Sequence, residues 1–159
     1  MSAENRPAPR DVVLVSACLV GSFCRHDGRT KKDLVLLREL ARDGVEIVPF
    51  CPEEEGGLGT PRPEAWIERE GAHAVLDGRD RVVAITGADV TREFVRGAEL
   101  ALAQCQRHGI RRAFLKERSP SCGVCQTYVG GELVDTPGVT GELLKRNGIA
   151  VEGIEGLRE

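Results

Sequence analysis

The sequence predicts an α/β fold: a single compact domain with a mostly parallel, Rossmann-like sheet flanked by helices. Short apolar runs typical of buried strands alternate along the chain with amphipathic helical patterns, which is the arrangement of repeated βαβ units. The length of 159 residues, with 41% hydrophobic and 30% charged side chains, fits one globular domain. We therefore expect residues 11–159 to form this domain, and the polar residues 1–10 to be a flexible N-terminal lead.

The first half of the chain predicts two strands and a helix between them. Residues 11–17 are a β-branched apolar run, typical of a strand buried on both faces, and the run ends on Cys18. Residues 31–42 carry leucines at helical spacing. Residues 45–50 predict a second strand, which ends on Cys51 as the first ended on Cys18. An irregular loop rich in Gly, Pro and Glu follows.

The second half continues the alternation. Residues 65–85 predict short strands, with Asp77 and Gly78 as the turn of a hairpin. Residues 89–106 have the longest helical pattern, with an apolar stripe along one face. Residues 110–116 predict a third strand, and residues 138–154 a short helix and a last strand.

Three cysteines follow the predicted strands of the parallel sheet. Cys18 and Cys51 come directly after the first two strands, and Cys122 follows the third. In open parallel sheets, ligand sites form beyond the carboxyl ends of the strands. The predicted topology therefore brings three thiols from distant sequence positions to one edge of the sheet.

The chemistry of such a site is open from spacing alone. Three thiolates suit a [4Fe-4S] cluster whose fourth iron has no protein ligand and can act as a Lewis acid. Thiolates also select zinc, although zinc sites usually use close cysteine pairs and only Cys122 and Cys125 form a CxxC pair. Structural or redox-active thiols are the third possibility.

The other cysteines differ in their context. Cys105 lies on the apolar stripe of its predicted helix, so we expect it in the core. Cys24 and Cys125 are alternates, either as metal ligands or as nearby thiols that accept sulfur, but neither follows a strand directly.

Polar residues near these cysteines are candidates for catalysis. The run Glu53, Glu54, Glu55 follows Cys51 in a shaped loop, and a carboxylate beside a metal can move protons to or from water, although charge runs are often simply solvated. Hydroxyls of Ser119 and Ser121 lie just before the third cysteine, where they either donate to a bound heteroatom or cap a turn.

Three further residues on the same predicted rim, Arg25, Asp27 and Arg62, are candidates to orient a polar heterocycle or an anion.

The net charge of -3 gives no general attraction to a phosphate backbone, so we expect no nucleic-acid partner. No apolar run is long enough to span a bilayer, and the first residues lack the apolar core of a secretory signal. We expect a cytoplasmic protein, where thiols stay reduced.

Five sequence blocks together resemble a bacterial family long known only as a domain of unknown function, which includes the thiouracil desulfidases. The blocks are SACLVGSFCRHDG, PFCPEEEGGLGTPRP, ITGADVTREFVRGAELAL, LKERSPSCG and PGVTGELLKRNGI. The resemblance implies a [4Fe-4S] cluster on three cysteines, whose fourth iron takes the sulfur of a thiolated nucleobase such as thiouracil. The products are the oxo base and hydrogen sulfide, without net redox change.

Carried over by position, the resemblance implies that Cys18, Cys51 and Cys122 are the cluster ligands. It implies Glu55 as the catalytic acid/base and Ser119 or Ser121 as the supporting hydroxyl.

This sequence departs from the family pattern at two positions. His26 stands in place of Tyr and Gly59 in place of Pro, so the wall against the substrate differs. A small thiolated compound is thus the expected substrate, and the chain is expected to act as a monomer or homodimer. A non-catalytic zinc, cluster or redox-sensing module is the alternative, and a thiol enzyme using Cys122 and Cys125 as a redox pair is a third hypothesis.

Overall fold

The main sheet of the protein is parallel throughout. The structure, a computed structural model, describes residues 11–159, so the expected lead at residues 1–10 lies outside the described residues. The sheet has four strands in the order β2-β1-β5-β8, all parallel. Their bounds are β1 (Val12–Ser16), β2 (Glu46–Phe50), β5 (Arg112–Lys116) and β8 (Ala150–Ile154). The predicted α/β fold is confirmed.

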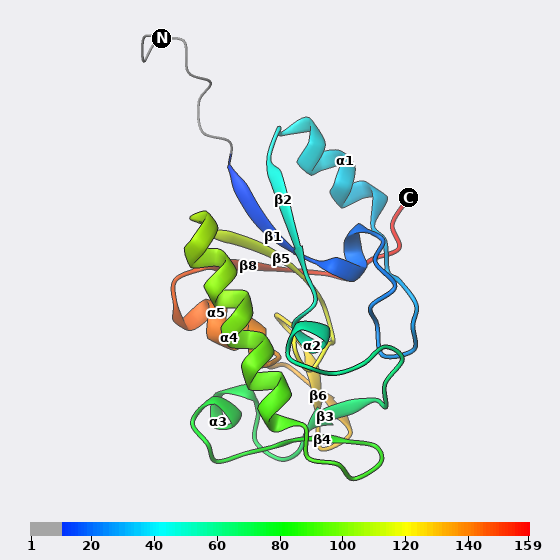
Figure 1. Cartoon of the computed structure of the whole chain (residues 1–159), viewed down its shortest axis with the longest axis vertical. Coiled ribbons are helices and arrows are strands. Elements are labelled where there is room, and N and C mark those ends of the chain that lie inside the picture. The colour runs from blue at the N-terminus through cyan, green and yellow to red at the C-terminus, as the bar shows by residue number, and fades with distance from the viewer. Residues whose placement is uncertain (1–10) are drawn as a thin grey trace.

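Helices cover both faces of this sheet (Figure 1). They are α1 (Leu34–Arg42), α4 (Thr91–His108) and α5 (Val139–Arg146). Successive residues of a strand point to opposite faces. Val13 and Val15 therefore pack in one cluster with Leu36 of α1, whereas Leu14 packs on the other side with Ala101 of α4. None of the helices within residues 11–159 is long and apolar enough to cross a membrane.

A second, smaller sheet lies beside the first. It has four strands in the order β4-β3-β6-β7, with bounds β3 (Ala65–Ile67), β4 (Val82–Ala84), β6 (Thr127–Val129) and β7 (Glu132–Val134). Strands β3 and β6 are parallel, and the two outer pairs are antiparallel. The predicted hairpin turn at Asp77 and Gly78 is wrong, because these residues end a short helix, α3 (Ala72–Leu76), that connects β3 to β4.

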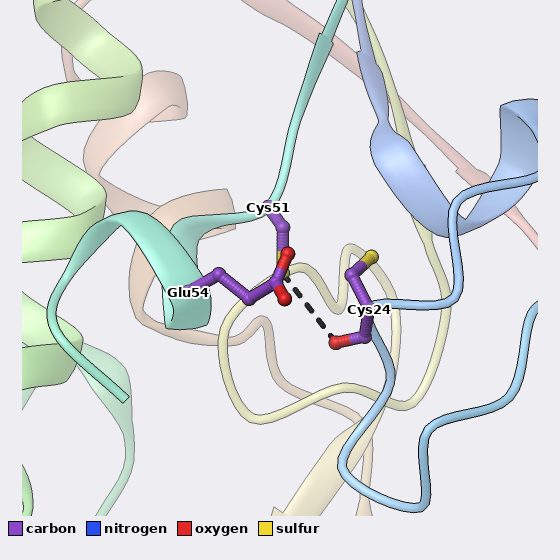
Figure 2. A group of neighbouring side chains, drawn as sticks. All are labelled: Cys24, Cys51 and Glu54. Carbon is purple, nitrogen blue, oxygen red and sulfur yellow. Dashed lines mark hydrogen bonds between the residues drawn. The ribbon is translucent and has the colours of Figure 1, made fainter. Parts of the chain in front are cut away.

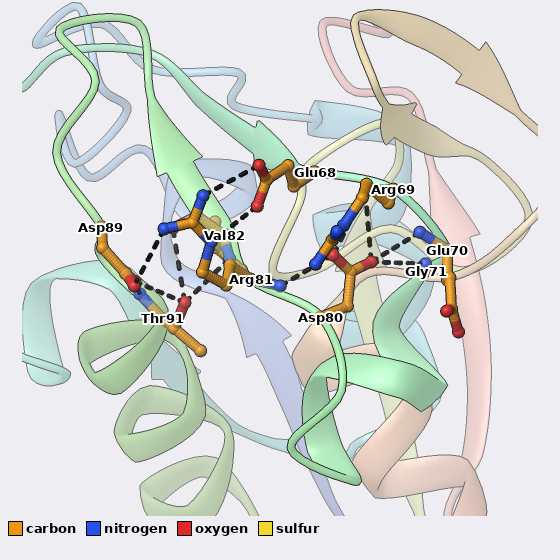
Figure 3. Close-up of polar contacts among 9 residues, drawn as sticks. All are labelled: Glu68, Arg69, Glu70, Gly71, Asp80, Arg81, Val82, Asp89 and Thr91. Atoms are coloured by element: carbon orange, nitrogen blue, oxygen red, sulfur yellow. Dashed lines mark hydrogen bonds and ion pairs between the residues drawn. The ribbon is translucent and has the colours of Figure 1, made fainter.

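A buried carboxylate holds the connection between β3 and β4 (Figure 3). Asp80 is 4% exposed and accepts backbone N–H groups of Arg69, Glu70, Gly71 and Arg81. Burial alone would raise the pKa of Asp80, but these N–H donors outweigh it and lower the pKa. The loop before α3 is thereby fixed to the start of β4.

The segment after β2 forms a short helix, α2 (Pro52–Glu55), where the sequence predicted an irregular loop. Proline is favourable in the first turn of a helix, because its missing N–H group would have no partner there. The helix lies directly on α4, and a Cβ atom at Gly97 would overlap the carbonyl group of Pro52. This close approach holds the chain that carries Cys51 against the long helix.

Candidate metal centre

The three predicted cysteines meet where the topology of the main sheet changes direction. From β1 the chain goes to β2 on one side, and it later returns to β5 on the other side of β1. Ligand sites of open α/β sheets lie at such switch points. Cys18 lies on η2 (Ala17–Val20), a 3-10 helix after β1, Cys51 precedes α2, and Cys122 lies in the turn after β5. All three line one cavity of about 340 Å³.

Cys24 joins this group, although it follows no strand. It lines the same cavity and is 3% exposed. The loop after η2 brings it there, and the Cys51 thiol donates a hydrogen bond of 3.7 Å to the Cys24 carbonyl oxygen (Figure 2). The ligand atoms of Cys24, Cys51 and Glu54 all lie within 4.8 Å of one another.

The remaining two thiols lie outside the cavity. Cys105 is 1% exposed in the core beneath α4, as the sequence predicted. Cys125 is exposed and does not line the cavity. All six cysteines are free thiols.

Crowding and burial raise the pKa of three cavity thiols, those of Cys24, Cys51 and Cys122. Burial raises the pKa of Cys122 to about 12. The hydrogen bond with the Cys18 thiol, followed by burial, raises the pKa of Cys24 to about 11, and the hydrogen bond with Cys24 is the largest cause that raises the pKa of Cys51. Thiols packed this way resist forming several thiolates unless a cation compensates their charge. A set of converging sulfur donors therefore fits an iron–sulfur cluster or another thiophilic metal.

The two predicted serines have different surroundings. Ser119 lines the cavity, and its Oγ accepts the N–H groups of Ser121 at 3.1 Å and Cys122 at 2.9 Å. Ser121 is fully buried, and its Oγ is paired with Thr140 Oγ1 at 2.9 Å. Ser121 does not line the cavity, so of these two serines only Ser119 can present a hydroxyl to a bound molecule.

A buried glutamate that the sequence analysis did not single out holds the Cys122 turn. Glu117 is 6% exposed, and its Oε1 accepts the N–H groups of Val124, Cys125 and Gln126 at 2.8, 2.9 and 3.1 Å. Burial alone would raise the pKa of Glu117, but these N–H donors outweigh it and lower the pKa. The signal in the sequence was a charged residue directly after an apolar strand and before a cysteine turn.

The first turn of α5 holds the same turn from the other side. The N–H groups at the start of a helix have no partner within the helix. Here they donate to carbonyl oxygens of the Cys122 turn: Gly138 to Gly123, Val139 to Pro120, and Thr140 and Gly141 to Ser121. The position of Cys122 is therefore fixed mainly by backbone hydrogen bonds.

The acidic run presents one carboxylate to the cavity. Glu53 lines it, and its Oε1 accepts a hydrogen bond of 3.1 Å from Arg62 Nε, with both side chains largely buried. Glu55 is exposed and does not line the cavity. In an α-helix, residues two apart point in nearly opposite directions, so α2 cannot present both carboxylates to the site.

The structure places two of the three predicted substrate-binding residues at the cavity. Arg25 and Arg62 line the cavity, but Asp27 does not. Besides Glu53, the Arg62 guanidinium binds the Cys24 carbonyl oxygen at 2.9 Å and Thr60 Oγ1 at 2.9 Å. The N–H groups of this guanidinium therefore connect the Cys24 loop to α2.

The family of 2-thiouracil desulfurases matches this chain over residues 13–155. The chain belongs to this family. A relative in Bacillus subtilis (strain 168), the uncharacterized protein YbbK, is 38% identical over 143 residues, which are 88% of this chain and 93% of the relative. A solved structure described as a [4Fe-4S]-dependent thiouracil desulfidase, TudS, is 45% identical, with a TM-score of 0.79 and 93% of each chain covered. The resemblance to the thiouracil desulfidase family that the sequence blocks indicated is therefore confirmed.

Proposed function

We propose that this chain is a desulfidase that removes sulfur from thiouracil or a similar small thiolated compound. Its [4Fe-4S] cluster would be held by Cys18, Cys51 and Cys122. The observation that carries the proposal is that these three thiols line one cavity at the switch point of the sheet, in a 2-thiouracil desulfurase family member. When bound, such a cluster supplies an iron without a protein ligand, a Lewis acid for a thiocarbonyl sulfur.

Glu53 is the carboxylate that we assign to proton transfer. Its side chain lines the cavity and is oriented by Arg62, so it can accept a proton from a water molecule that attacks the thiocarbonyl carbon. The carbon–oxygen bond forms, the carbon–sulfur bond breaks, and sulfur leaves as hydrogen sulfide with the protons of the water. No oxidant or reductant is needed.

Ser119 and Arg25 have supporting roles in this proposal. The Ser119 hydroxyl lines the cavity and retains its own proton while its oxygen accepts backbone N–H groups, so it can donate to a bound heteroatom. Arg25 lies on the wall of the cavity, where its charge can orient a polar heterocycle. Free thiols at the site are consistent with work in a reducing, cytoplasmic compartment.

The test is anaerobic reconstitution with iron and sulfide, followed by turnover of 2-thiouracil. We expect about four irons per chain, an absorption band of the cluster, and release of uracil and sulfide. Alanine at Cys18, Cys51 or Cys122 should abolish the cluster, while the matched control Cys125→Ala should retain it. A colourless protein with one tightly held zinc would instead support a non-catalytic metal module.

The role of Glu53 is tested within the same acidic run. Glu53→Gln should keep the iron content and lower kcat by ~100-fold or more, the usual size of a lost general base. Glu55→Gln makes the same chemical change on the exposed side of α2. If Glu55→Gln loses turnover and Glu53→Gln does not, the role belongs to Glu55.

A further inference from the structure

A second group of side chains at the rim of the cavity has the chemistry to bind a metal ion, and it shares only Cys51 with the three proposed cluster ligands. Cys24, Cys51 and Glu54 place two sulfur atoms and a carboxylate oxygen within 4.8 Å of one another. Figure 2 shows the Glu54 carboxylate next to the Cys51 sulfur, with Cys24 on a separate loop beside them. Cys24 is buried, Cys51 is half-buried and Glu54 is exposed, so the group extends from the cavity wall to solvent.

Two of these ligands are oriented by neighbouring groups. Thr60 Oγ1 donates to Glu54 Oε2 at 2.6 Å, and Thr60 in turn accepts a hydrogen bond from Arg62 Nη1 at 2.9 Å. The Nη2 group of Arg62 also holds the Cys24 backbone through its carbonyl oxygen. Hydrogen bonds of this kind, which orient a ligand from outside, are typical of built metal sites.

The donor set selects the kind of ion. Two thiolates and one carboxylate favour a divalent ion of borderline softness, Zn²⁺ or Fe²⁺, over Mg²⁺ or Ca²⁺, which prefer oxygen ligands. Around a tetrahedral zinc the donors are roughly 3.3–3.8 Å apart, so small side-chain rotations close the present arrangement. Glu54 faces solvent, from which water can fill the fourth position.

We propose that Cys24, Cys51 and Glu54 form a second metal site, which binds a single Zn²⁺ or Fe²⁺ ion in the cluster-free protein. Because Cys51 belongs to both sets of ligands, the single ion and a cluster on Cys18, Cys51 and Cys122 exclude each other. The rim site therefore holds one ion at the mouth of the cavity before the cluster is present.

The test measures zinc affinity of the full, reduced and metal-free chain against a competing chromophoric chelator. Wild type should bind one zinc ion per chain. Cys24→Ser, which removes the thiol and nearly keeps its size, should weaken binding by ~100-fold, and Glu54→Gln by ~10-fold. Cys125→Ser and Glu55→Gln are matched controls that should bind zinc as wild type does.

A Cys122→Ser variant separates the rim from the deep part of the cavity. It should keep wild-type zinc affinity, because Cys122 is not a rim ligand. Equal weakening in Cys122→Ser and Cys24→Ser would place the ion among the deep thiols and overturn the proposal, as would wild-type affinity in Cys24→Ser. Circular dichroism verifies that each variant is folded. The measurement needs neither cluster nor turnover, so its outcome is independent of the proposed desulfidase activity.

Discussion

The two sides of the cavity are held in place by different means. On the Cys122 side, the backbone is bound by the Glu117 carboxylate, by Ser119 and by the first turn of α5. On the Cys24 side, fewer hydrogen bonds connect the loop to the rest of the site. The Arg62 guanidinium binds the Cys24 carbonyl oxygen and the Glu53 carboxylate, the Arg62 backbone N–H donates to the His26 carbonyl oxygen, and the Cys51 thiol donates to the Cys24 carbonyl oxygen.

This difference implies an order in which the site forms. A segment held by many backbone hydrogen bonds opens only at a large free-energy cost, whereas a loop held by a few hydrogen bonds opens locally at a smaller cost. We infer that the Cys122 side is preformed before any metal binds and that the Cys24 side adjusts to what is bound. The four predictions that follow test this contrast.

The largest effect is expected from Glu117→Ala. The change leaves three N–H groups, one buried and two partly buried, without their acceptor, and each such loss costs about 1–3 kcal/mol where the group stays away from water. We expect the free energy of unfolding, measured by urea denaturation of the cluster-free chain, to fall by about 3 kcal/mol or more. Glu39→Ala, on the exposed face of α1, is the control and should change little.

The contribution of Glu117 to the free energy of unfolding should depend on pH. The pKa of Glu117 is lowered in the folded chain, so its stabilisation is fully present above the unfolded pKa of about 4.3 and is lost as the pH falls through the folded value. The difference in stability between wild type and Glu117→Gln should therefore shrink on acidification below that pH. A difference that stayed constant would mean that the charge of Glu117 is not what holds the turn.

A smaller and more local effect is expected from Arg62→Met. It removes the hydrogen bonds to Cys24, Glu53 and Thr60, and the free energy of unfolding should fall by about 1–2 kcal/mol. Hydrogen exchange should accelerate in residues 22–30, while residues 117–126 remain protected. Equal acceleration in both segments would remove the contrast between the two sides.

The sequence predicted the parts of the fold that have long, regular patterns. The strands of the main sheet and helices α1, α4 and α5 follow from apolar runs and helical spacing. Helix α3 and strands β6 and β7 were missed, because none of them shows a long apolar run or a helical repeat. The hairpin turn was inferred from a local dipeptide, whereas tertiary packing decided that α3 forms there.

The site was predictable where topology alone determines position. Cys18, Cys51 and Cys122 follow strands that share one sheet edge, so their meeting follows from strand order. Cys24 reaches the cavity through the path of a loop, which no periodic pattern encodes. Which of Glu53 and Glu55 faces the cavity depends on the helical conformation of α2, and the sequence did not predict this helix.

The smallest effect is expected from Ser119→Ala, and its size tests whether the Cys122 turn is held redundantly. The variant loses an acceptor for the N–H groups of Ser121 and Cys122, but Glu117 and α5 still hold the turn from both sides. We expect the free energy of unfolding to fall by only about 1 kcal/mol in the same urea titration. A loss as large as that of Glu117→Ala would mean that the hydrogen bonds act as one cooperative unit, and the Cys122 side would then be no better secured than the Cys24 side.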